Sequence, residues 1–262
     1  MDQRSRRAPR EYPAGETNDP TSSEPNSLDV NLGSSASGID VRLAQDFLAL
    51  GPAIRILQLN VEGLSAAKRT LIGTIAIEQN IDIICLQETH IDKDESRLFT
   101  IQGYDLISYV LHAKHGRATY VIQDLADAQQ VRTTKHCDII RVGGFHVANV
   151  YKPPSENWQE STLPILPHPA VYVGDFNSHH TQWGYNSACR DGEALAEWAS
   201  ANDFHLVYDP KQKGTFRSAR WNQEYNPDLC WVSSAGNCPQ PARVSVLTDI
   251  AHQSSMLVCS CR

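Results

Sequence analysis

An acid and an amide stand two residues apart in the stretch VYVGDFNSHH, which spans residues 171–180. The alternating apolar run before them predicts a strand, and in an extended chain the side chains at positions i and i+2 point to the same face. We therefore expect Asp175 and Asn177 to project together from a strand end. A rigid sheet holds polar groups at its rim without burying them, so this pair is a candidate for chemistry.

Polar side chains recur at the ends of the other predicted strands. They are Asn60, Glu62, Glu88, Tyr151 and Asp228. If these strand ends converge, they form one acidic pocket, and acidic groups gathered around a bound Mg²⁺ serve enzymes that attack phosphates. Taken singly, a carboxylate at a strand end can equally be a turn former or a helix cap, and Tyr151 can be a packed aromatic residue. Such structural interpretations leave the joint recurrence unexplained.

The elements that must position these residues begin near Ala53, where short apolar runs alternate with helical stretches. Strands are expected at residues 54–61, 81–89, 104–111, 118–123, 138–154 with a turn at Gly143–Gly144, 170–176, 205–209 and 227–233. Helices are expected at residues 66–80 and 192–203, and the first carries an apolar stripe of Leu71, Ile72, Ile75 and Ile77. Helices that alternate with hairpins predict a mixed α/β sandwich rather than a purely parallel sheet.

Residues 1–52 differ in composition from the rest of the chain. They are poor in apolar side chains and rich in Ser, Pro, Gly and Asn, so they cannot bury enough apolar surface to offset the entropy of ordering. We interpret them as a disordered leader with a possible short helix at residues 41–50, and residues 53–262 as one folded domain. No segment has the apolar core of a signal peptide or the roughly 18 apolar residues of a membrane span, so we expect no membrane partner.

Charge and cysteine usage narrow the class of protein further. The net charge of −7 argues against a protein whose whole surface binds nucleic acid, although it permits a local site. The seven cysteines form no CxxC pair and no pairing with histidine at zinc spacing, which disfavours a disulfide framework or a zinc site. Free thiols in a reducing compartment, nuclear or cytoplasmic, fit better.

Seven short motifs follow one another along the chain. They are LQLNVEGL, ICLQETH, NVYKPP, VGDFNSHHTQWG, ALAEWASANDFHLV, GTF and NPDLCWV. In this order and at these spacings the sequence resembles the endonuclease/exonuclease/phosphatase superfamily, and within it the apurinic-type endonuclease domain of non-LTR retrotransposons. The resemblance covers residues 54 to about 250. It implies an α/β (α+β) fold, namely a four-layer sandwich of two mixed β-sheets flanked by helices.

The resemblance also implies roles for the polar residues at the strand ends. Asn60 and Glu88 match the positions that bind a divalent metal, with Glu62 as an auxiliary candidate, and such hard oxygen ligands suit Mg²⁺ or Mn²⁺. Asp175 matches the residue that orients or deprotonates the attacking water, and Asn177 matches a donor to a phosphate oxygen. In-line attack on a phosphodiester needs both functions, which would explain why the two residues stand side by side.

Further positions match groups around the substrate. Tyr151 corresponds to a residue at the scissile phosphate, Thr215 to a threonine near the substrate, and Asp228 to the carboxylate that orients the catalytic histidine. His180, beside the GDFN motif, either faces DNA as a substrate-binding residue or packs the loop against Trp183. A zinc site built on the neighbouring histidine pair would lack further ligands at a usual spacing.

The match breaks near the C-terminus, where the family has Ser-Asp-His or Ser-Gln-His. The corresponding stretch is VLTDIAHQSSMLVCSCR. Either Ser255 occupies the position of the catalytic histidine, which is then lost, or His252 itself fills that position with Asp249 or Asp228 orienting its ring. The chain ends at Arg262, where a retrotransposon protein would continue into a reverse transcriptase, so we expect a truncated fragment or a degenerate copy.

Three functions follow from these observations. The first is a metal-dependent endonuclease that nicks target DNA for the insertion of a non-LTR retrotransposon. The second is a phosphatase or phosphodiesterase that acts on a small substrate, and the third is a catalytically degenerate remnant or DNA-binding module. The acidic net charge weighs against DNA, and the altered terminal motif predicts weak nuclease activity.

Overall fold

The computed structural model describes residues 53–125, 127–159, 163–218, 222–236, 238–248 and 256–262. The chain divides into two units, Met1–Pro52 and Ala53–Arg262, and both sheets belong to the second. The predicted leader with its helix at residues 41–50 lies outside the described residues, and so do His252 and Ser255. Over the described ranges, no helix combines the length and the apolar character that crossing a membrane requires.

The first sheet has six strands in the order β14-β15-β1-β2-β4-β3. Their bounds are β1 Ile54–Asn60, β2 Ile83–Gln87, β3 Tyr104–Val110, β4 Arg117–Ile122, β14 Ala242–Leu247 and β15 Met256–Cys261. Strands β1 and β2 are parallel, and the other pairs are antiparallel. Helix α2 (Ala66–Glu78) makes the crossover between β1 and β2, and the Ser65 side chain caps it by accepting from the backbone N–H of Lys68.

The second sheet runs in the order β13-β12-β8-β7-β6-β5, and β9 also pairs with β12. Its strands are β5 Ala128–Thr133, β6 Cys137–Val142, β7 Phe145–Tyr151, β8 Ala170–Asp175, β9 Phe204–Leu206, β12 Asp228–Ala235 and β13 Cys238–Pro239. Strands β7 and β8 are parallel and the rest are antiparallel, so both sheets are mixed. Helix α3 (Arg190–Ala201) joins β8 to β9, and two short 3-10 helices lie at Ser96–Leu98 and Thr181–Trp183.

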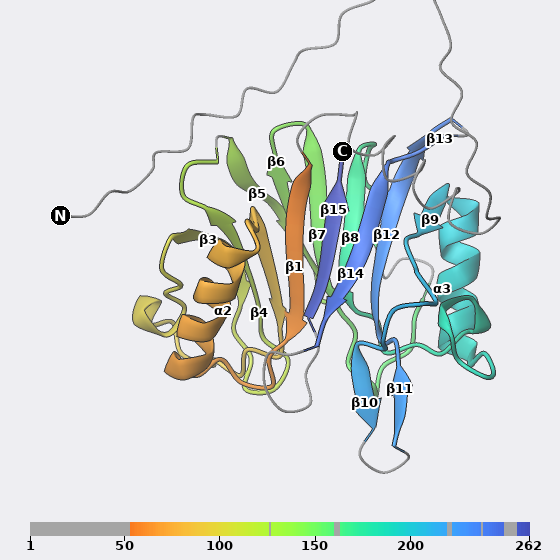
Figure 1. Ribbon diagram of the computed structural model, residues 1–262, viewed down its shortest axis with the longest axis horizontal. Helices are drawn as coiled ribbons and strands as arrows, with labels where there is room; N and C mark the ends of the chain where they lie inside the picture. Colours follow the sequence, from red (N-terminus) through yellow and green to blue (C-terminus); the bar gives the residue numbers. More distant parts are fainter. Residues whose placement is uncertain (1–52, 126, 160–162, 219–221, 237, 249–255) are drawn as a thin grey trace, which may run out of the picture. The chain divides into compact units, whose positions relative to one another are not determined.

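Three apolar clusters hold four layers together (Figure 1). The first cluster packs α2 against the first sheet, the second lies between the sheets, and the third packs α3 against the second sheet. A small hairpin of β10 (Phe216–Ser218) and β11 (Gln223–Tyr225) projects beyond the sheets. The predicted four-layer sandwich of two mixed sheets flanked by helices is confirmed.

The apolar face of α2 differs from the predicted stripe. Ile72 and Ile75 are buried against the sheet as expected, but Leu71 and Ile77 are 40% and 57% exposed. The helix instead buries Ala76 and Gly73, because its small residues allow a close approach to the segment around Ile101. Leu71 and Ile77, members of the predicted stripe, therefore lie outside the buried face of the helix.

Candidate active site

The strand ends that carry polar residues meet at one cleft of about 700 Å³. Strands β1 and β8 end in Asn60 and Asp175, Glu88 directly follows β2, and β12 begins at Asp228. The cleft is lined by Asn60, Glu62, Glu88, Pro154, Asp175, Asn177, His179, Tyr185, Asn186, Ser187, Thr215, Phe216, Ser218, Tyr225, Pro227 and Asp228. The two sheets thus bring together residues that lie up to 168 positions apart in the sequence, from Asn60 to Asp228.

Asp175 lies at the centre of the hydrogen bonds in this cleft. Its Oδ2 accepts from Asn60 Nδ2 at 3.0 Å, and its Oδ1 accepts from the backbone N–H of Asn177 at 3.1 Å. Burial, and then the nearby charge of Asp228, raise the pKa of Asp175 to about 8. A buried carboxyl with a raised pKa is suited to hold or accept a proton near neutral pH.

Asp228 stands opposite Asp175 in the antiparallel pair of β12 and β8. Burial raises the pKa of Asp228 to about 6, while Gln58 opposes the shift by donating to Oδ1 at 2.6 Å. The Thr215 hydroxyl also lowers this pKa, although it is buried without a hydrogen bond of regular geometry. Two neighbouring carboxyls in this setting favour a proton or a cation between or beside them.

Glu88 lines the cleft and is held by Tyr151, a predicted site residue that is buried and is not among the described residues that line it. The Tyr151 hydroxyl donates to Glu88 Oε1 at 2.7 Å and lies 3.2 Å from His115 Nδ1. Because the phenol proton is directed to the carboxylate, His115 contributes its Nδ1 hydrogen to the Tyr151 oxygen. Burial, and then the hydrogen bond and charge of Glu88, raise the pKa of Tyr151 well above its usual value, so its hydroxyl stays a donor.

The backbone at the cleft is unusual at several predicted site residues. Of eight non-glycine residues with positive φ in the described ranges, three are Glu62, Glu88 and Asn177, at 43°, 53° and 44°. Non-glycine residues in the left-handed region often mark functional sites, because the surrounding structure must impose the conformation. Asn177 is fixed further by its side chain, whose Nδ2 donates to the Lys152 carbonyl at 3.0 Å.

The donors present suit a hard divalent cation. Glu62, Glu88, Asp175 and Asp228 all line the cleft, and no lysine or arginine is among the described residues that line it. Across the described ranges, no three His, Cys, Asp or Glu side chains converge tightly enough to form a complete metal cage. Mg²⁺ usually takes only one or two carboxylates and completes its octahedron with water and substrate phosphate, so this donor set fits it.

His180 is a predicted site residue that does not line the cleft. Its Nδ1 caps the short helix Thr181–Trp183 by accepting from the backbone N–H of Gln182, and its ring packs 4.8 Å from that of Trp183. Of the two alternatives predicted for His180, the structure thus shows the one in which it packs the loop against Trp183. The neighbouring His179 lines the cleft instead, with its ring stacked 4.3 Å from that of Tyr185.

Sequence reasoning missed the aromatic wall of the cleft. Tyr185 stacks on Tyr225 at 5.3 Å, and Phe216, which is 48% exposed, forms a cross-strand pair with Tyr225 on the β10–β11 hairpin. The signal was weak, because these aromatic residues lie in short polar stretches without periodicity. The wall offers flat apolar surface beside the acidic floor, which is suitable for stacking a base.

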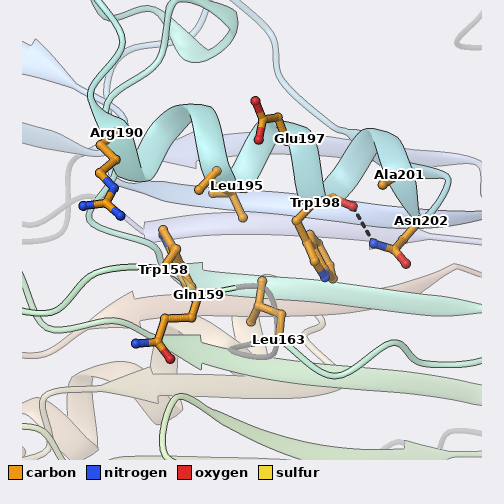
Figure 2. Close-up of a pocket in the computed structure, with 10 residues that line it drawn as sticks. Trp158, Gln159, Leu163, Arg190, Leu195, Glu197, Trp198, Ala201 and Asn202 are labelled. Carbon is orange, nitrogen blue, oxygen red and sulfur yellow. Dashed lines mark hydrogen bonds between the residues drawn. The ribbon is translucent and has the colours of Figure 1, made fainter.

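A second hollow of about 580 Å³ lies against α3 (Figure 2). Trp158, Leu163, Leu195 and Trp198 face it, and Asn202 Nδ2 closes the helix end by donating to the Trp198 carbonyl at 2.7 Å. None of the predicted site residues is among the described residues that line it. This hollow therefore adds nothing to the chemistry of the cleft.

Over part of its length the sequence is similar to known proteins. Residues 145–254 match the family described as endonuclease-reverse transcriptase. The chain is 26% identical over 171 residues to the RNA-directed DNA polymerase from mobile element jockey of Drosophila funebris, a match that covers 60% of this chain and 18% of that protein. The chain therefore spans less than a fifth of the length of this curated relative.

Solved structures share the fold. The endonuclease domain of TRAS1, a telomere-specific non-LTR retrotransposon, matches with a TM-score of 0.61 and 17% identity over 80% of this chain and 99% of that chain. The AP endonuclease LMAP from Leishmania major matches with a TM-score of 0.62 and 13% identity over 80% of this chain and 88% of that chain. These structures share the fold of this chain, and over residues 145–254 its sequence is similar to the endonuclease-reverse transcriptase family.

Proposed function

We propose that the chain is a metal-dependent DNA endonuclease that nicks target DNA for a non-LTR retrotransposon. The observation that carries the proposal is the convergence of Glu88, Asp175 and Asp228 with the donors Asn60 and Asn177 in one open cleft. A phosphodiester presents negative oxygens, so an acidic cleft can bind it only together with a cation. The donor set described above meets that requirement.

The residues of the chain have distinct roles in this proposal. Asp175 positions the attacking water and accepts its proton, for which its raised pKa is suited. Asn177 uses its second amide hydrogen to stabilise a nonbridging oxygen, whereas Tyr151 acts through Glu88, to which it donates its single hydroxyl proton. Thr215 lines the cleft beside Asp228, and we assign it to the substrate side.

Glu88 and Asn60 are the residues we assign to Mg²⁺ or Mn²⁺, with the exposed Glu62 as a further ligand. When bound, such an ion neutralises charge that develops on the phosphate and the leaving oxygen. Tyr151 fixes the orientation of the Glu88 carboxylate through the 2.7 Å hydrogen bond. Asn60 is oriented by donating to Asp175 and by accepting from the backbone N–H of Glu62 at 3.2 Å.

DNA is favoured over a small phosphorylated substrate by the walls of the cleft. The β10–β11 hairpin extends away from the sheets (Figure 1). Its exposed Phe216 lies opposite Tyr225, whose ring stacks on that of Tyr185. A long open wall with aromatic faces suits a polymer with bases. We assign the chain to the endonuclease part of a longer element protein, whose reverse transcriptase would be a partner in cis.

A supercoiled plasmid incubated with the chain and Mg²⁺ tests the proposal. We expect slow conversion to the open circle, abolished by EDTA and by Glu88→Ala, because an apolar side chain cannot bind the ion. Glu78→Ala, an exposed carboxylate at the end of α2, is the matched control and should leave nicking unchanged. Undiminished nicking by Glu88→Ala or in EDTA would contradict the metal-dependent mechanism.

The C-terminal histidine is a separate question within the same assay. If Ser255 occupies the catalytic position, His252→Ala should change nicking little, and the parent chain should be weak. If His252 fills the position, His252→Ala should remove nicking. A positioned donor of this kind typically contributes on the order of 10²–10³ in rate, so the two outcomes are easily separated.

A further inference from the structure

A chain of buried amides runs behind the cleft and ends at Asp228. Gln58, Gln87 and Asn149 are each fully buried, and they come from β1, β2 and β7. Gln87 Nε2 donates to Asn149 Oδ1 at 2.6 Å, and Gln58 Nε2 donates to Gln87 Oε1 at 2.7 Å and to Asp228 Oδ1 at 2.6 Å. This row of hydrogen-bonded side chains therefore crosses from the second sheet to the first and back to the second at β12.

Asn149, at the end of the row away from Asp228, fixes which group donates in every hydrogen bond of the row. Asn149 Nδ2 donates to the backbone carbonyls of Leu86 and Ala118, both at 3.2 Å. A carbonyl oxygen only accepts, so the Asn149 amide cannot turn over, and its Oδ1 must face Gln87. Gln87 Nε2 is held the same way, because it also donates to the Cys85 carbonyl at 3.3 Å.

The orientation of the Gln87 amide also fixes that of the Gln58 amide. Since Gln87 turns its Oε1 toward Gln58, only the amino group of Gln58 can face both Gln87 and Asp228. The consequence is an unfavourable one for stability, because Gln58 Oε1 is left buried without a hydrogen-bond partner in the described structure. The unpaired oxygen follows from presenting one amino group to both Gln87 Oε1 and Asp228 Oδ1, which an apolar residue at this position would leave without this donor.

We propose that Gln58 is a positioning residue of the endonuclease: its buried amide keeps Asp228 Oδ1 as a hydrogen-bond acceptor and so fixes the carboxylate toward the cleft. A proton that binds Asp228 is then directed to Oδ2, because Oδ1 already accepts. Asp228 then presents Oδ2 to the substrate side of the cleft, where Asp228 lies next to Asp175 and Thr215. This inference rests on the phosphodiester-cleaving function proposed above.

The first test reads the hydrogen bond without any activity. In ¹⁵N-labelled chain, the side-chain amide signals of Gln58 are assigned as those that disappear in Gln58→Glu. We expect their exchange with solvent to be at least about 100-fold slower than that of the exposed Gln123 amide, and their shift to move in Asp228→Leu but persist in Asp228→Asn, which keeps an acceptor. Exchange as fast as that of Gln123, or a shift that ignores Asp228→Leu, would overturn the proposal.

The second test separates positioning from a purely structural role. Gln58→Glu keeps the shape of the side chain and removes the obligatory donor, so it should lower kcat for plasmid nicking about 10- to 100-fold while KM changes less than about two-fold. Gln123→Glu makes the same chemical change beside the carboxylate of Asp105 on the surface and should leave kcat unchanged. An unchanged kcat in folded Gln58→Glu, or a loss that appears in KM instead, would refute the positioning role. If the parent chain does not nick DNA, the proposed function fails, and the amide signals still decide the hydrogen bond.

Discussion

Gly174, which directly precedes Asp175, should tolerate no side chain. Its φ is 153°, and a Cβ built there would lie 2.7 Å from the backbone carbon of Val150, 2.8 Å from its nitrogen and closer still to its oxygen. Ordinary contacts are about 3.5 Å or more, so Gly174→Ala must push β8 away from its parallel partner β7 by more than about an ångström. Tyr151 pairs with Asp175 on these strands, so the displacement reaches the site directly.

The expected loss of stability is about 2–4 kcal/mol, because overpacking costs about 1–3 kcal/mol and a weakened buried backbone hydrogen bond about 1 kcal/mol. Urea unfolding followed by circular dichroism measures it, and nicking should fall by at least about 100-fold. Gly144→Ala, at the β6–β7 turn with no atom within 4 Å of the new Cβ, is the matched control and should stay within about 0.5 kcal/mol of the parent. A Gly174→Ala protein as stable as Gly144→Ala would refute the close-approach argument.

Three further predictions concern single side chains. Tyr151→Phe should lower nicking about 10- to 100-fold with little change in melting temperature, because it removes the donor to Glu88; equal kcat values would contradict this. Arg117→Leu should lower the free energy of unfolding by about 3–5 kcal/mol in urea, since it leaves the buried Asp138 carboxylate without the Arg117 guanidinium, whose Nε lies 2.9 Å away. A change below about 1 kcal/mol would contradict a stabilising role for this ion pair. Ser255→His should raise plasmid nicking if the histidine has been lost at that position, and an unchanged rate would argue against that alignment.

Much of the fold was predictable because its central strands are short, apolar and β-branched. The hairpin around Gly143–Gly144 is present as β6 and β7, and the helices predicted at 66–80 and 192–203 correspond to α2 and α3. Strand β5 escaped prediction because its residues are mostly exposed and polar, with no apolar face to reveal a period. The β10–β11 hairpin escaped because three-residue strands carry too little pattern.

The candidate site was predictable in its floor and not in its walls. Asn60, Glu88 and Asp175 follow strands whose apolar runs are easy to recognise, so their convergence followed from the topology. Gln58 was invisible as a site residue, because an amide inside a strand gives no sign of the partner 170 positions away that it bonds. His180 shows the converse, since this histidine beside the GDFN motif caps and packs a loop and does not line the cleft.

Nicking of supercoiled plasmid by matched proteins with and without Asp175 tests the central claim most directly. The parent chain and Ser255→His are each compared with the same protein carrying Asp175→Asn, which keeps the shape of the side chain and removes the carboxyl oxygen that positions water and accepts its proton. We predict Mg²⁺-dependent open circles from at least the Ser255→His protein, and none once Asp175→Asn is added. Nicking that survives Asp175→Asn, or no nicking by either protein at any Mg²⁺ concentration, would contradict a phosphodiester-cleaving function for this cleft.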